Sequence, residues 1–424
     1  MGSVWVCILD FWEPDIPGVV RSYTHKPVRP QGQLFLEMLS MKKSLLALAV
    51  LGAFSGAAFA QSNVQLYGII DLGVAHVTGL KPAGTATAGQ TVSSTSLNSG
   101  VQSGSRIGLK GTEDLGGGLN AFFDVETGFC AAGTNQMGTT LQSAGNQTYC
   151  TGGGFMQRQA YAGLNGGFGT VSAGRQYTPA FLNEANMDPF GFGLAGDIGN
   201  ISVVSQYQLW RANQSVAYVT PNLSGFTGIA AYSFAGGAAG TVPTVSGPGS
   251  NVSRAWVLNG QYGNGPITAG LNYGRVTNIY APSLAASADG SLKVWQAYGA
   301  YDFGVAKISG IYESASQDYF TGKNTSWMLG ATVPVGPGAI LVSYENAKNT
   351  LVPDGLTGSG KGTAKQYAIG YTYSLSKQTD LYTSYAHISN GIGTTFGVGD
   401  ATDGNVGVAG QGSSGFDFGI RHQF

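Results

Sequence analysis

Few side chains in this sequence stand in patterns that could do chemistry. After residue 60 the histidines are His76, His387 and His422, and a hydrolase would need one of them beside a serine or an aspartate. His387 and Ser384 are three residues apart, which on a strand places them on opposite faces. The run 191–196 fits G-x-G-x-x-G, but it neither follows an apolar parallel strand nor opens a helix. We therefore predict that the protein is not an enzyme and that it needs no cofactor.

Two cysteines, Cys130 and Cys150, lie in one polar segment rich in Gly, Thr, Ser and Gln. In an exported chain the simplest interpretation of such a pair is a disulfide, which would contribute about 3 kcal/mol in the chain-entropy model. A metal site would need histidines or further cysteines nearby, and the sequence has none there. We therefore predict a disulfide and no metal.

The composition excludes several classes of protein. Charged residues make up 10% of the chain, where about 25% is typical, and 68 of 424 residues are glycine, where about 7% is average. The net charge of −1 excludes a strongly basic nucleic-acid-binding protein. The sequence contains no run of eighteen apolar residues, so it predicts no membrane-spanning helix. Abundant glycine with 21 Tyr and 20 Phe suits many short strands joined by turns and flanked by aromatic girdles.

Residues 41–60 have the plan of a secretory signal peptide. Two lysines precede an apolar stretch from Leu45 to Phe54, and Ala58-Phe59-Ala60 forms a cleavage site before Gln61. We expect the mature barrel to span 61–424. Residues 1–40 have no readable periodicity, and we interpret them as a mis-assigned upstream start, with Met41 or Met38 as the initiator. A real N-terminal extension is the alternative.

From Asn63 onward the sequence alternates with period 2 over sixteen segments, which predicts sixteen strands. Eight longer segments, predicted to be outward loops, lie at about 79–100, 130–154, 178–206, 235–251, 277–291, 314–325, 347–364 and 389–413. Seven short connections, predicted to be periplasmic turns, lie at 111–118, 165–167, 221–225, 263–266, 302–304, 335–338 and 375–379. Sixteen antiparallel strands with both termini on one side need seven turns and eight loops, so the count is self-consistent. A barrel of this size leaves an aqueous channel.

The C-terminal strand has one apolar and one polar face and ends on Phe424. In a soluble protein such an aromatic edge would promote aggregation, so a soluble β-sandwich is the weaker alternative. In an outer-membrane barrel the same strand closes the wall, and its terminal aromatic residue addresses the barrel-assembly machinery. We therefore predict a transmembrane barrel in the cell outer membrane, in contact with lipid and lipopolysaccharide.

The sequence resembles the general porins of β-proteobacteria, of the Neisseria, Bordetella, Burkholderia and Comamonas type. The motifs that carry the resemblance are SRIGLKGTEDLGGGL (105–119), VQLYGIID (64–71), GLNGGFGTVSAGRQ (163–176), RANQSVAYVTP (211–221), YDFGVAK (301–307) and the ending GIRHQF (419–424). They run from the first strand to the last. The resemblance implies a homotrimer of all-β, 16-stranded antiparallel barrels, each narrowed by an inward-folded third loop. Here that loop is 177–207, and it has Met187-Asp188-Pro189-Phe190-Gly191 where relatives often have Pro-Glu-Phe-Gly-Gly.

The resemblance also implies a ladder of arginines facing the third loop, and its members align with Arg106, Arg158 and Arg211. Cationic side chains in a narrow neck raise the local anion concentration. The alternation turns Arg106 toward the lumen, whereas for Arg158 it is equivocal. The alternatives are salt bridges that anchor the loop, or trimer contacts. Arg175 and Lys110 could also reach the neck.

The predicted acidic side of the constriction consists of Asp188 and Asp197, with Glu184, in the third loop. The competing interpretation is that the aspartates cap local turns, because Asp beside Pro and Gly is prone to do so. Tyr67 and Phe122 face inward, but no stacked aromatic ladder is evident, so a dedicated sugar channel is not favoured.

These patterns together predict a passive outer-membrane channel for small hydrophilic solutes and ions, with a preference for anions. The alternative is a substrate-specific channel, or an adhesin whose loops bind a partner, on the same barrel.

Overall fold

The computed structural model describes residues 63–81, 90–132, 156–234, 254–279, 290–318, 320–350, 352–353, 361–399 and 406–424. The predicted signal peptide and the segment before it lie outside these residues. In the part of the chain that is described, no helix is long and apolar enough to cross a membrane.

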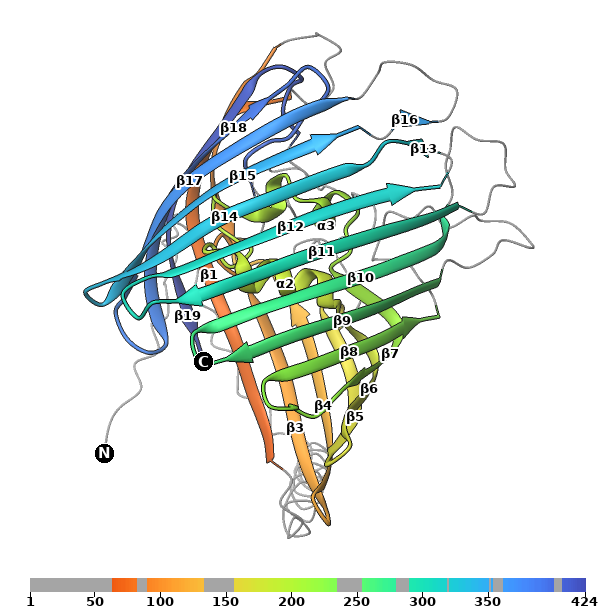
Figure 1. Cartoon of the computed structure of the whole chain (residues 1–424). Coiled ribbons are helices and arrows are strands. Elements are labelled where there is room, and N and C mark those ends of the chain that lie inside the picture. Colours follow the sequence, from red (N-terminus) through yellow and green to blue (C-terminus); the bar gives the residue numbers. More distant parts are fainter. Residues whose placement is uncertain are drawn as a thin grey trace, which may run out of the picture. The chain divides into compact units, whose positions relative to one another are not determined.

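The wall consists of antiparallel strands that follow one another in chain order (Figure 1). They are β1 (Asn63–Leu80), β2 (Val92–Ser99), β3 (Arg106–Gly116), β4 (Leu119–Gly128), β5 (Gln159–Gly166), β6 (Gly169–Tyr177), β7 (Arg211–Val219), β8 (Phe226–Ser233), β9 (Arg254–Asn264), β10 (Ile267–Ile279), β11 (Gly290–Asp302), β12 (Lys307–Gln317), β14 (Asn324–Val335), β15 (Gly338–Asn349), β17 (Gly362–Ser374), β18 (Thr379–Asn390) and β19 (Gly412–Gln423). A separate small sheet pairs β13 (Phe320–Thr321) with β16 (Val352–Pro353).

The sheet closes because β1 pairs with β19, from Ile69 opposite Gln423 to Thr78 opposite Ser414. On its other edge β1 pairs first with β3 and then, beyond Ile69, with β2. The strands β2 and β3 thus share one position in the wall, and the barrel has sixteen positions. The prediction of a closed, 16-stranded antiparallel barrel is confirmed.

The seven short connections fall where the alternation breaks at glycine, proline and polar residues. The hairpin between β3 and β4, for example, turns at Gly117 and Gly118, both of which have positive φ. Three predicted loops differ from expectation, because segments 314–325 and 347–364 contain the short strands β13 and β16, and segment 79–100 contains β2. That strand is rich in Ser and Thr, and it supplies hydrogen-bond partners to the second half of β1, which would otherwise have an unpaired edge.

The two faces of the wall differ in polarity. On β12, Ile308 and Tyr312 are exposed on one face, whereas Ser309 and Glu313 are buried on the other. The same alternation leaves Val64 and Leu66 of β1 more than half exposed. Because the sheet is closed, the exposed apolar side chains form the outer face and the polar side chains form the inner face.

Segment 178–210 packs against the inner face. It contains α2 (Pro179–Met187), the 3-10 helix η1 (Ile198–Asn200) and α3 (Val203–Gln206), whose N-caps are Thr178, Asp197 and Ser202. In Figure 1 α2 and α3 are seen behind the strands β10 to β14, and both helices contact β12. The Asn183 side chain donates hydrogen bonds to Asn259 and Gln296, both at 3.1 Å. These bonds attach the helices to the polar face of the wall.

The chain end completes the wall. The backbone N–H of Phe424 donates to Gly68 O at 3.1 Å, and Gly68 N–H donates to Phe424 O at 3.0 Å. The Phe424 ring lies directly over Gly68, because a Cβ on that glycine would be 2.3 Å from the ring. Only glycine allows this close approach between β1 and the last residue.

Candidate functional site

The three aligned arginines meet on the inner face of the wall. Arg106 begins β3, Arg158 immediately precedes β5, and Arg211 begins β7. Glu126 of β4 lies between the first two: its carboxylate is 2.5 Å from Arg158 Nε and 3.8 Å from Arg106 Nη1. Arg158 and Arg211 are almost fully buried, whereas the side chain of Arg106 keeps 20% of its surface exposed. We call these three guanidinium groups the arginine cluster.

Tyr177, the last residue of β6, holds the cluster together. Its hydroxyl accepts hydrogen bonds from Arg158 Nη2 at 2.6 Å and from Arg211 Nη2 at 2.9 Å. The guanidinium of Arg211 also lies over the Tyr177 ring, 4.5 Å from its centre, and Phe181 of α2 stacks against the same ring at 4.7 Å. One ring thus links the wall, two arginines and the inner segment.

The arginine cluster faces an open cavity of about 220 Å³. The remainder of its lining comes from the end of β6, the inner segment and the stretch between β2 and β3: Gly100, Gln102, Ser103, Gly104, Tyr177, Phe181, Ala185, Gly191, Phe192 and Trp210. Among the described residues that line this cavity there are three arginines and no carboxylate. The cavity therefore has a positive lining on the inner side of the wall.

The other two candidate cations lie apart from this cavity. Arg175 donates from Nε to Gln157 O at 2.5 Å, just before β5, and from Nη1 to Asn213 Oδ1 of β7. Lys110 lies farther along β3, toward the turn, and its Nζ is 5.2 Å from the centre of the Tyr67 ring. It lines a different cavity, described below.

The three acidic residues of the inner segment, which the sequence predicted as the acidic side of a constriction, are buried. Asp188 accepts hydrogen bonds from the backbone N–H groups of Phe190, Phe192 and Ile198 at 3.0–3.2 Å. Asp197 caps η1 by accepting from Gly199 N–H at 2.6 Å. Both aspartates thus hold turns of the segment, as the competing interpretation proposed. Burial raises the pKa of Asp188 to about 6 against the opposing effect of these bonds.

Glu184 of α2 is fully buried against the wall, close to Glu313 of β12. Burial, and then the charge of Glu313, raise the pKa of Glu184 well above its ordinary value, which favours the neutral acid. Glu313 itself accepts hydrogen bonds from Val203 N–H at 3.0 Å and from Gln296 Nε2 at 2.7 Å. Glu313 thus attaches the segment to the wall, and neither carboxyl group lines the cavity of the arginine cluster.

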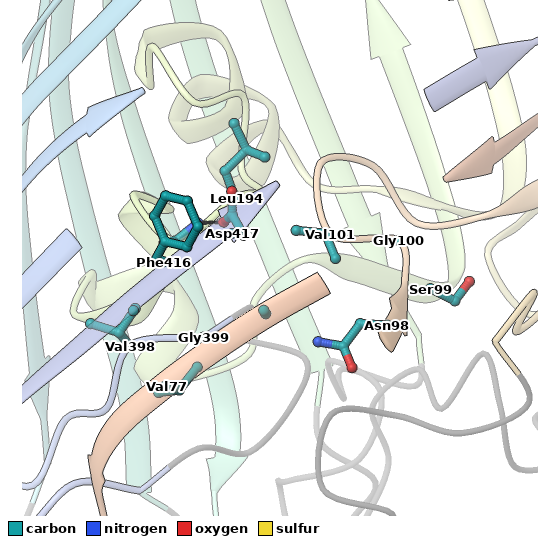
Figure 2. A pocket seen from close by; sticks show the side chains of 13 residues that line it. Val77, Asn98, Ser99, Gly100, Val101, Leu194, Val398, Gly399, Phe416 and Asp417 are labelled. Atoms are coloured by element: carbon teal, nitrogen blue, oxygen red, sulfur yellow. Dashed lines mark hydrogen bonds between the residues drawn. The ribbon is translucent and has the colours of Figure 1, made fainter. Parts of the chain in front are cut away.

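The middle of the segment is attached near the closing strands (Figure 2). Leu194 N–H donates to Val101 O at 2.6 Å, and Ala195 N–H donates to the Asp417 carboxylate of β19 at 2.6 Å. Figure 2 shows Leu194, Val101 and Asp417 around a small cavity of about 20 Å³. The segment is therefore attached to the wall at α2, through Asn183, and again near its middle, through Ala195.

Cys130 follows β4 and is disulfide-bonded. The partner that the sequence predicts, Cys150, lies outside the described residues. Among the residues that the structure covers, no group of three or more His, Cys, Asp or Glu side chains could hold a metal ion.

Comparison with known proteins identifies the fold and the family. A family model described as Gram-negative porin matches residues 47–393, which is well over half of the chain. The chain belongs to the Gram-negative porin family. Residues 41–46 and the segment before them lie outside the match, as do the last strand and its terminal phenylalanine.

Individual porins resemble this one along almost their whole length. An outer membrane porin protein of Bordetella pertussis is 32% identical over 403 residues, covering 85% of this chain and 99% of the relative. Outer membrane porin protein 32 of Delftia acidovorans is 34% identical over 406 residues, covering 91% and 100%. The solved structure of an anion-selective porin from Comamonas acidovorans has a TM-score of 0.67 at 28% identity, covering 86% of this chain and 100% of that one. This porin is therefore an outer-membrane diffusion channel.

Two residues of the site escaped the sequence analysis as members of it. Glu126 was not among the predicted site residues, and Tyr177 was named only as the start of the third loop. Their contacts with the arginines follow from how neighbouring strands pair. Arg106 lies opposite Gly128, two residues after Glu126, and Tyr177 lies opposite Arg211. Pairing is not visible from one sequence, so their contacts with the arginines could not be found that way.

Proposed function

We propose that this porin passes small hydrophilic solutes and ions by passive diffusion and favours anions, with Arg106, Arg158 and Arg211 at its narrowest part. The observation that carries the proposal is the cavity of the arginine cluster, whose described lining includes three guanidinium groups and no carboxylate. Glu126 offsets part of this charge from within the wall.

The electrostatic consequence follows from the imbalance of charge. Three arginines and one glutamate leave a local excess of two positive charges. A unit charge about 6 Å from an ion interacts with it by about 0.7 kcal/mol even at the dielectric constant of water. Each positive charge in excess therefore raises the local anion concentration about threefold, and a narrow pore with apolar walls strengthens the effect.

Segment 178–210 is proposed to be the third loop that narrows the pore opposite the arginines. Its support is the set of bonds that attach it to the polar inner face at Asn183, Leu194 and Ala195. Because its acids are buried, the face that the segment presents to the cavity is neutral, with Phe181 and Phe192 among its side chains. A neutral face leaves the arginines as the dominant charge.

The remaining properties of the family are proposed for this chain as well. We expect a homotrimer, a signal peptide at 41–60 that is cleaved on export, contact with lipid and lipopolysaccharide, and assembly directed by the C-terminal strand. One solved relative, OmpT of Vibrio cholerae, is described in a trimer form. We propose no catalytic activity, in keeping with a family of channels.

Charge reversal at Arg106, the most exposed member of the cluster, tests the proposal. In planar bilayers with a KCl gradient, Arg106→Glu is expected to move the zero-current potential toward cation preference. The matched control is Arg254→Glu, a reversal at an exposed residue outside the cavity. An unchanged potential in Arg106→Glu would contradict the proposed constriction. Small or absent current steps in the unmodified protein would instead favour a plugged or substrate-specific barrel.

A further inference from the structure

A second cavity lies on the inner face of the wall, nearer to the short turns than the arginine cluster. Its volume is about 340 Å³, and its lining includes Lys110 of β3, Phe122 and Asp124 of β4, and Tyr161 of β5. Along β3, Lys110 is four residues beyond Arg106, so the two cationic side chains project from the same face about 13 Å apart. An anion that passes the arginines would meet this cavity next.

The Phe122 ring at this cavity lies close over a glycine of the wall, as does the neighbouring Tyr67 ring. A Cβ on Gly163 would be 2.6 Å from the Phe122 ring, and a Cβ on Gly108 would be 2.4 Å from the Tyr67 ring. The Phe122 and Tyr161 rings meet edge to face, with their centres 6.3 Å apart and an interplanar angle of 76°. Rings fixed in this way present a face to the lumen at little conformational cost.

The charged side chains at the cavity are Lys110 and Asp124, which lie opposite each other on β3 and β4. Asp124 is already engaged, because it accepts a hydrogen bond from the Tyr67 hydroxyl at 2.8 Å and interacts with the hydroxyl of Tyr161. Lys110 is exposed, and among the described residues its Nζ is in no ion pair. The cavity thus combines an exposed ammonium group with two aromatic side chains, and one oxygen of its carboxylate is occupied by the Tyr67 hydroxyl.

We propose that this cavity, lined by Lys110, Phe122 and Tyr161, is a binding site for small aromatic carboxylates. The ring of the ligand stacks on Phe122 and meets the edge of Tyr161, while its carboxylate is bound by Lys110 Nζ. We call it the aromatic site. The assignment rests on the proposed function only in that anions must reach the lumen. The consequence is that the channel slows and enriches aromatic carboxylates relative to aliphatic ones of the same charge.

The test uses benzoate and acetate as probes of the full-length channel in planar bilayers. Each anion is added to a KCl solution, and the concentration that blocks half of the chloride current is measured. Because one aromatic contact shifts binding by about twofold to tenfold, benzoate is expected to block at a concentration lower than acetate by that factor. Phe122→Leu is expected to remove the difference, and Lys110→Gln to weaken block by both anions.

Two further variants distinguish loss of the aromatic site from loss of an aromatic ring elsewhere in the barrel and from misfolding. Phe418→Leu removes an aromatic ring from the exposed outer face of β19 and is expected to keep the preference for benzoate. Tyr161→Leu reports on the same site if Phe122→Leu does not fold, which the unit conductance in KCl will reveal.

Equal block by benzoate and acetate, with chloride preference retained, would overturn the aromatic site and leave the anion channel standing. Stronger block by benzylammonium than by benzoate would also overturn it. Absence of chloride preference would overturn the proposed function alone, because a block by benzoate that depends on Phe122 would still be measurable.

Discussion

Replacing Glu126 by glutamine removes the carboxylate around which the arginines are arranged. Glu126 pairs with Arg158 at 2.5 Å and with Arg106 at 3.8 Å, and it is 3% exposed. Glutamine keeps the size of the side chain and one acceptor oxygen but removes the charge. The change therefore raises the net charge of the cluster by one unit with little change in shape.

The expected effect on selectivity follows from Coulomb's law. For an ion passing about 6 Å away, one charge is worth about 0.7 kcal/mol at the dielectric constant of water, or about threefold in concentration. The added charge raises the local concentration of anions about threefold and lowers that of cations about threefold. The ratio of anion to cation permeability is therefore expected to rise by up to about tenfold. The Debye length is about 10 Å at 0.1 M salt and about 3 Å at 1 M. The shift in permeability ratio should therefore be measurable at 0.1 M and become small near 1 M.

The same change is expected to lower stability. Arg158 is buried and loses its closest charge partner, and removing one member of a buried pair typically costs about 3–5 kcal/mol. The channel should therefore become more anion-selective and less heat-stable at once. This combination separates Glu126 from a residue that only packs the wall.

The assay is the zero-current potential in a KCl gradient at low and high salt, together with the thermal unfolding midpoint. Glu113→Gln, at an exposed position on β3, is the matched control, for which neither quantity should change. A Glu126→Gln channel with unchanged selectivity, or with a shift toward cations, would refute the reasoning that this carboxylate offsets the arginines.

Three other predictions follow from the geometry. Gly68→Ala is expected to lower the unfolding midpoint, because the added Cβ would meet the Phe424 ring at 2.3 Å, and such overpacking costs about 1–3 kcal/mol; Gly260→Ala, with no atom within 4 Å of the new Cβ, should leave the midpoint unchanged. Because burial raises the pKa of Asp188 to about 6, docking of segment 178–210 should weaken by about 3 kcal/mol as pH rises from about 4 to above 6. Hydrogen exchange of the amides bonded to Asp188, corrected for intrinsic rates, measures this, and greater protection at pH 7 than at pH 5 would contradict it. Reduction of the disulfide at Cys130 should lower heat stability by about 3 kcal/mol and leave the unit conductance unchanged; a changed conductance would place that loop in the ion path.

The wall could be predicted from the sequence because each strand is marked by the alternation of its own residues. Every second residue of a strand such as β12 or β15 lies on the exposed apolar face, and each short turn interrupts that alternation, so the alternation marks where these strands begin and end. The strand β2 was missed because its Ser and Thr side chains resemble those of a loop. What makes it a strand is the unpaired edge of β1, which lies elsewhere in the sequence.

The site was predictable only in part. Alternation turned Arg106 toward the lumen, but Arg158 precedes its strand, so periodicity could not place it. The acids of the inner segment could not be assigned, because an aspartate beside proline and glycine can either face a pore or cap a turn. The choice depends on contacts over long separations, such as that of Asn183 with Gln296, 113 residues away.

The zero-current potential of the unmodified channel across a KCl gradient tests the central claim most directly. An excess of positive charge at the arginine cluster predicts that chloride permeates faster than potassium, and that this preference weakens as salt rises toward 1 M. A potential of the opposite sign, or one at the value for unselective diffusion at every salt concentration, would contradict the assignment of these arginines to the narrowest part of the pore.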